Sequence, residues 1–78
     1  MRTSQPRFSK ASVAETIERH MKVAAEGHDF DPKQGSLQVE RAARKKLGRM
    51  PSETEMTDAI ACYRAWEALG ALREELGL

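Results

Sequence analysis

The stretch from Gln38 to Ile60, QVERAARKKLGRMPSETEMTDAI, decides the fold of this chain. Its first half carries apolar residues at helical spacing among basic ones, and Gly48 is suited to end that helix because glycine takes positive φ without strain. Ser52 then predicts the N-cap of a second helix, and Glu55 completes a capping box with it. The stretch therefore predicts two helices joined by a short turn.

Upstream of this stretch, the sequence predicts one more helix over residues 13–26. Ser12 and Glu15 fit a capping box at its start. Residues 1–11 are polar and basic, with no apolar pattern of their own. We therefore expect a flexible basic arm over residues 1–11, followed by a single helical domain over residues 12–78.

Helix breakers and caps set the other boundaries. Residues 28–36 contain an Asp-Pro pair and a glycine, which predict a loop whose Phe30 side chain enters the core. The basic helix is expected over residues 37–47, with Ser36 as its N-cap. The last helix is expected to reach about Leu76. The predicted fold is all-α, a three-helix domain with a helix-turn-helix-like corner and a long C-terminal helix.

Length and composition limit what a chain of 78 residues can do. A domain this small is marginally stable without a disulfide, a metal or a partner subunit. The single cysteine cannot form an internal disulfide, and with two histidines it shows no metal-ligand spacing, so no metal site and no cofactor are expected. No apolar run reaches the roughly 20 residues of a membrane span, and the N-terminus lacks a signal-peptide pattern. We expect a cytoplasmic protein with no membrane partner.

The net charge of +1 hides an uneven distribution. Residues 36–50 carry five positive charges and one negative, whereas residues 51–78 carry two positive and six negative. Two interpretations stay open: the helices neutralise each other's field, or the basic helix binds a polyanion. If nucleic acid is bound, the expected phosphate contacts are Arg41, Arg44, Lys45, Lys46 and Arg49.

The last helix carries apolar residues on two sides. At 100° per residue, one side carries Met56, Ala59, Ile60, Tyr63 and Trp66 and is expected to face the core. Nearly the opposite side carries Leu69, Leu72 and Leu76, with Cys62 and Ala65. One helix cannot bury two opposed faces within so small a monomer, unless Gly70 divides it. We therefore expect a homodimer or a protein partner, with an interface built from Trp66, Leu69, Leu72 and Leu76.

Catalytic chemistry is not expected of this sequence. No Ser-His-Asp set, no pair of catalytic carboxylates and no phosphate-binding glycine loop can be assembled from its residues. The chain is therefore predicted not to be an enzyme.

The segment RAARKKLGRMPSETEMTDAI, from Arg41 to Ile60, resembles the third conserved region of bacterial primary sigma factors. In that family, a basic amphipathic helix ends in Leu-Gly-Arg and is followed by a proline, a capping residue and a Glu before the next helix. The resemblance covers about a quarter of the chain, and its residues are also those that helix termination and capping require. It implies a helix-turn-helix that binds DNA, carried by Leu47, Gly48, Arg49, Pro51, Ser52 and Glu55.

These observations favour a small DNA-binding regulatory protein, acting in transcription or for a phage or other mobile element. The acidic start of the last helix would repel phosphate, so the basic helix is expected to make the contacts. The alternative is a protein-interaction module, such as a phage-type inhibitor, that docks on a larger complex through the last helix. A purely structural dimer subunit is a third possibility.

Overall fold

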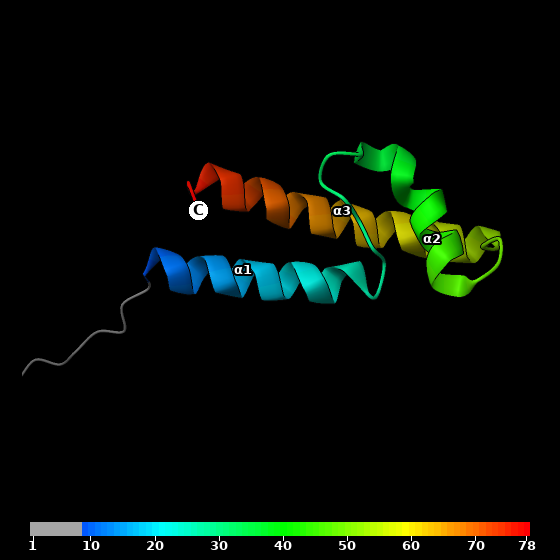
Figure 1. The fold of residues 1–78 in the computed structure, drawn as a ribbon, viewed down its shortest axis with the longest axis horizontal. Helices are drawn as coiled ribbons and strands as arrows, with labels where there is room; N and C mark the ends of the chain where they lie inside the picture. The colour runs from blue at the N-terminus through cyan, green and yellow to red at the C-terminus, as the bar shows by residue number, and fades with distance from the viewer. Residues whose placement is uncertain (1–8) are drawn as a thin grey trace, which may run out of the picture.

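The computed structural model describes residues 9–78 as three α-helices and one 3₁₀ turn. The helices α1 and α3 lie side by side and run antiparallel, and α2 packs against the N-terminal half of α3 (Figure 1). The all-α class predicted from sequence is confirmed. The elements are α1 (Lys10–Ala25), η1 (Gly35–Gln38), α2 (Val39–Leu47) and α3 (Glu53–Glu75).

The start of α1 differs from the prediction. The helix begins at Lys10, and its N-cap is Ser9, whose hydroxyl accepts a 3.0 Å hydrogen bond from the Ser12 amide. Ser12, the predicted cap, instead sits in the first turn, where its carbonyl accepts from the Thr16 hydroxyl at 2.9 Å. The last residues of the predicted arm are therefore helical, and the rest of that arm, residues 1–8, lies outside the described residues.

The start of α2 also differs from the prediction. Residues 35–38 wind as the tighter η1 turn, and α2 follows directly from Val39. Ser36 lies inside η1, so it is not the N-cap, and no side chain caps α2. Expecting a helix from residue 37 with Ser36 as its cap was therefore wrong, because the tighter turn moves the helix start towards the C-terminus.

The amide of Gln38 fixes the loop ahead of α2. This side chain is only 4% exposed. Its oxygen accepts from the Asp31 N–H at 2.6 Å, and its nitrogen donates to the carbonyls of Asp31 at 2.7 Å and Gly35 at 2.9 Å. Gln38 therefore supplies the acceptor for the Asp31 N–H and a further donor to the Asp31 carbonyl, which also accepts from the Gln34 N–H at 3.1 Å.

The turn between α2 and α3 matches the prediction closely. Gly48 ends α2 in the left-handed region, at φ 73°, and its N–H donates to the Arg44 carbonyl at 2.8 Å. The Ser52 hydroxyl accepts from the Glu55 amide at 3.1 Å, and the Glu55 carboxylate accepts from the Ser52 amide at 2.8 Å. This reciprocal pair is the predicted capping box, and it starts α3 at Glu53.

Replacing Ser52 with alanine is expected to lower the free energy of unfolding by about 0.5–2 kcal/mol, because the Glu55 amide loses its acceptor. Urea unfolding followed by circular dichroism measures the change. Ser36→Ala is the matched control and is expected to shift stability by less than about 0.5 kcal/mol, because that serine caps no helix. Equal losses in the two variants would contradict the assignment of the cap.

Gly70 does not divide α3, which runs unbroken to Glu75. The alternative of a break at Gly70 is therefore excluded, and the neighbouring helix α1 explains why a small residue stands there. A Cβ added there would lie 3.3 Å from Cε of Met21 on α1. Gly70 therefore allows α1 and α3 to pack closely, at the modest cost of about 1 kcal/mol in helix propensity.

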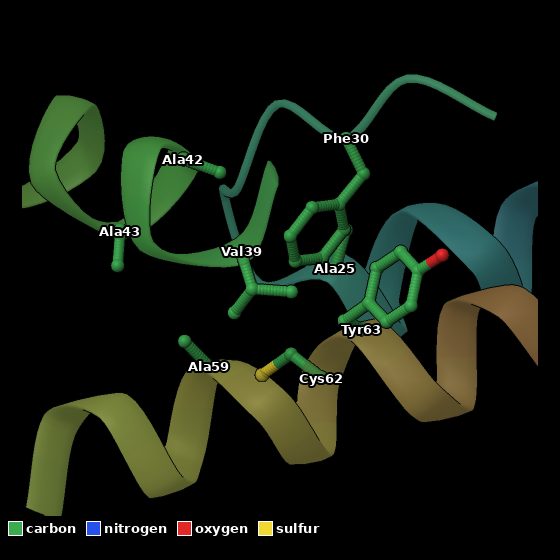
Figure 2. Close-up of a cluster of buried hydrophobic side chains, with 8 residues drawn as sticks. All are labelled: Ala25, Phe30, Val39, Ala42, Ala43, Ala59, Cys62 and Tyr63. Carbon is green, nitrogen blue, oxygen red and sulfur yellow. The ribbon is translucent and has the colours of Figure 1, made fainter. Parts of the chain in front are cut away.

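The core lies where α2 and the preceding loop cover α3 (Figure 2). The Phe30 ring enters it as predicted, with its centroid 5.3 Å from that of Tyr63 and 5.4 Å from that of Trp66. Small side chains line the helix contacts and permit close approach. The buried cluster is Ala25, Phe30, Val39, Ala42, Ala43, Ala59, Cys62 and Tyr63. Within residues 9–78, no helix has the length and apolar character needed to cross a membrane.

Candidate functional site

Helix α2 buries one face and exposes a basic one. Its buried residues, Val39, Ala42 and Ala43, face the core. At 100° per residue, Arg41, Arg44 and Lys45 lie on the opposite side of the helix, and all three are exposed. We call these three residues the basic face.

The lysine of the basic face has an acidic neighbour. Lys45 Nζ lies 3.1 Å from Oδ2 of Asp29, in the loop that follows α1. Both side chains are about three-quarters exposed, at 73% and 76%. An ion pair this exposed contributes little to stability, so Lys45 can exchange its carboxylate for another anion at small cost.

Lys46 points away from the basic face. Its side chain extends past Gly27, where an added Cβ would lie 3.6 Å from the Lys46 Cε. It lines a shallow hollow together with Glu26 and Asp58, which belong to the end of α1 and to α3. The structure therefore separates Lys46 from the other predicted phosphate contacts and sets it among carboxylates.

Arg49 makes its hydrogen bonds within the turn between α2 and α3 and with the first turn of α3. Its guanidinium donates two hydrogen bonds to the Glu55 carboxylate, at 2.7 Å and 2.6 Å, and a third at 3.2 Å to the Met50 carbonyl. The hydrogen bond from Arg49, aided by that from the Ser52 amide, lowers the pKa of Glu55 to about 2, and Glu55 raises the pKa of Arg49. Arg49 therefore braces the capping box, and the structure does not place it with the basic face.

The arginines of the basic face lack strong partners. Arg41 and Arg44 form no salt bridge with any carboxylate in residues 9–78. Their nearest polar contacts are long: 3.5 Å from Arg41 Nη1 to Oε1 of Gln34, and 3.9 Å from Arg44 Nη1 to Sδ of Met50. The guanidinium groups of Arg41 and Arg44 are therefore available to bind an external anion.

Two apolar residues beside the basic face were missed from the sequence. Leu37 is 92% exposed and lies four residues before Arg41, and Met50 is 58% exposed beside the Arg44 guanidinium. The i, i+4 spacing of Leu37 and Arg41 was the signal that could have identified the first. The exposed surface at α2 is therefore basic with apolar edges.

The predicted interface residues of α3 divide into two groups. Trp66 is half-buried and packs on the core, whereas Leu72 and Leu76 are 42% and 48% exposed. Leu69 is half-buried. The structure therefore keeps Leu72 and Leu76 at the surface and assigns Trp66 to the core.

The buried side of α3 is rotated from the predicted one. Cys62, expected beside the leucines, is buried in the core, and burial raises the pKa of its thiol. Ile60, expected on the core side, is 39% exposed. Both differences in burial arise because the positions of α1 and α2 decide which side of α3 is covered. The spacing of residues within α3 does not specify those positions.

The described residues contain no group of three or more His, Cys, Asp or Glu side chains arranged to hold a metal ion. The described residues expose two candidate binding surfaces: the basic face of α2, and Leu72 and Leu76 at the end of α3. Comparison of the chain with protein-family models, with curated proteins and with solved structures finds no match.

Proposed function

We propose that this chain is a small regulatory protein that binds duplex DNA through the basic face of α2, in transcription or for a mobile genetic element. The proposal rests on two exposed arginines, Arg41 and Arg44, that have no carboxylate partner among the described residues. Both lie on the side of α2 opposite the core.

Phosphate is the ligand that suits these groups. A guanidinium presents planar donors that match phosphate oxygens, and each contact releases condensed counterions from the DNA. Lys45 adds a third cation at the cost of a weak, exposed ion pair. The exposed Leu37 side chain beside them suits a thymine methyl group or the edge of a groove.

The charge distribution favours α2 over α3 as the helix that contacts DNA. The first turns of α3 carry Glu53, Glu55 and Asp58, which repel phosphate. In α2, the last turn is basic, with Arg44, Lys45 and Lys46. Nine residues of helix span roughly 14 Å, which is short enough to lie against the major groove.

Replacing Arg41 or Arg44 with alanine is expected to weaken duplex binding and to lower the slope of log affinity against log salt concentration by about one for each lost phosphate contact. Lys46→Ala is expected to change the slope much less, because that side chain lies among carboxylates. Fluorescence anisotropy with a labelled duplex, measured over a salt series, gives both quantities.

Arg19→Ala is the matched control, because Arg19 is an exposed arginine on α1 rather than on α2. Its affinity and salt slope are expected to equal those of the unmodified chain. Absence of duplex binding by the unmodified chain at low salt would contradict the proposal. Equal effects of Arg19→Ala and Arg41→Ala would indicate attraction by net charge rather than by the basic face.

A second candidate function is protein binding through α3, as expected of a module that docks on a larger complex. The observation that favours it is the exposure of Leu72 and Leu76 next to an acidic flank. Exposed leucines on a helix are typical anchors for a partner groove. This candidate does not require nucleic-acid binding, so the salt series separates the two.

A further inference from the structure

One side of α3 carries alanines between residues 61 and 68, and leucines follow on the same side at residues 72 and 76. At 100° per residue, this side lies opposite the buried Ala59 and Tyr63. Its members are all exposed, and they recur at spacings of three and four residues, as in the seam between paired helices. We call it the alanine–leucine face, and it consists of Ala61, Ala65, Ala68, Leu72 and Leu76.

The alanine half of this face borders a hollow. Its volume is about 430 Å³, and its wall includes residues from the end of α1 as well as from α3. Small side chains on the α3 side leave space that a larger side chain from outside can fill. The hollow is lined by Ala24, Glu26, Asp58, Ala61, Cys62 and Ala65.

We propose that the alanine–leucine face pairs with the same face of a second copy of this chain, with the two α3 helices antiparallel. One register sets Leu72 against Ala65 of the partner subunit and Leu76 against Ala61 of the partner subunit. Both pairs are centred on the same point of the helix, between Ala68 and Leu69, so a single two-fold axis satisfies them together. Leu76 then enters the hollow of the partner subunit.

Charges on one flank of the face fit the same register. Arg64 and Glu75 are exposed, lie within about 20° of each other around the helix axis, and form no ion pair within residues 9–78. Antiparallel pairing brings equal flanks together, with Arg64 about 3 Å along the axis from Glu75 of the partner subunit. Symmetry gives two such pairs, so the flank is complementary to itself.

The composition of the core supplies a reason for pairing. No large side chain in residues 9–78 is fully buried, and the helix contacts are made largely by alanines. A domain with so little buried apolar area gains stability when a second copy covers exposed leucines. The inference rests on α3 being an interaction surface and is independent of nucleic-acid binding by α2.

Sedimentation equilibrium over a concentration series tests the pairing. The unmodified chain is expected to reach twice its monomer mass of 8.7 kDa. Leu72→Glu is expected to raise the dimer dissociation constant by roughly 100-fold or more, because a charge would face Ala65 of the partner subunit in an apolar contact. Leu37→Glu is the matched control. It changes a more exposed leucine outside the face and is expected to leave the dimer intact.

Charge reversal tests the register. Arg64→Glu and Glu75→Arg are each expected to weaken the dimer by roughly tenfold, because each sets like charges against one another in two places. The double variant restores opposite charges and is expected to recover most of the affinity. Circular dichroism of each variant shows that the helices are intact.

Three results would overturn the inference. The first is a monomer at all concentrations, and the second is a dimer that Leu72→Glu leaves unchanged. The third is a monomer that dimerises once residues 1–8 are removed, which would show that the chain's own N-terminal segment covers the leucines. A monomer that binds a different protein through Leu72 would exclude the second copy while retaining α3 as an interaction surface.

Discussion

Replacing Phe30 with alanine is expected to lower the free energy of unfolding by about 3–5 kcal/mol. The ring is 9% exposed and lies between the loop and α3 (Figure 2). Its centroid is 5.2 Å from that of His28, which it stacks on, and it meets Tyr63 edge to face at 83°. Alanine would remove all of these contacts and leave a void among small residues that cannot collapse to fill it.

The total stability available makes this loss decisive. A chain of 78 residues is expected to unfold with roughly 4–12 kcal/mol, so Phe30→Ala would consume a large part of it. Thermal and urea unfolding measure the change, and Phe30→Leu provides a milder variant if the alanine variant does not fold. Leu37→Ala is the control: that leucine is 92% exposed, and its loss is expected to cost less than about 0.5 kcal/mol. A small loss at Phe30 would show that the aromatic cluster does not hold the core.

The sequence predicted the glycine stop and the capping box of the turn between α2 and α3 well, because their chemistry is local. The stop at Gly48 and the capping box of Ser52 and Glu55 each depend on residues within one turn of each other. The start of α1 was placed wrongly because Ser9 and Ser12 both offer a hydroxyl three residues before a backbone amide. Local chemistry does not choose between two such caps.

The candidate site was predicted only as a set of cations, and the fold determined how they are paired. The sequence analysis grouped Arg41, Arg44, Lys45, Lys46 and Arg49 together, and the structure leaves only the first three on one exposed side of α2. The contact between Lys45 and Asp29 joins residues 16 apart, so it depends on how the loop packs and no local pattern predicts it. Arg49 was likewise counted with the cations, although the turn between α2 and α3 directs its side chain to Glu55, six residues later.

The same limit applies to α3. Helical spacing gives the angles between its side chains, but not which sector α1 and α2 cover. Cys62 became part of the core and Ile60 stayed 39% exposed for that reason alone. Leu72 and Leu76 kept their predicted exposure, at 42% and 48%.

Replacing Gln38 with leucine is expected to lower the free energy of unfolding by about 2–4 kcal/mol, although leucine is close to glutamine in size. The change retains the packing of a side chain that is 4% exposed and removes its three hydrogen bonds. The Asp31 N–H would lose its acceptor, and the carbonyls of Asp31 and Gly35 would each lose a donor, at half-buried positions. The Asp31 carbonyl would keep its bond from the Gln34 N–H. Unpaired backbone groups of this kind are costly, because water reaches them only in part.

Gln34→Leu is the matched control for this substitution, because it makes the same change four residues away in the same loop. The Gln34 side chain is exposed, and its contacts, 3.1 Å to Asp31 Oδ2 and 3.5 Å to Arg41, lie in solvent. Its loss is expected to shift stability by less than about 0.5 kcal/mol. Urea unfolding compares the two variants, and hydrogen exchange at the Asp31 amide is expected to speed up only in Gln38→Leu. Equal stabilities with unchanged exchange would mean that the loop is held by Phe30 alone, and that the buried amide contributes nothing to the start of α2.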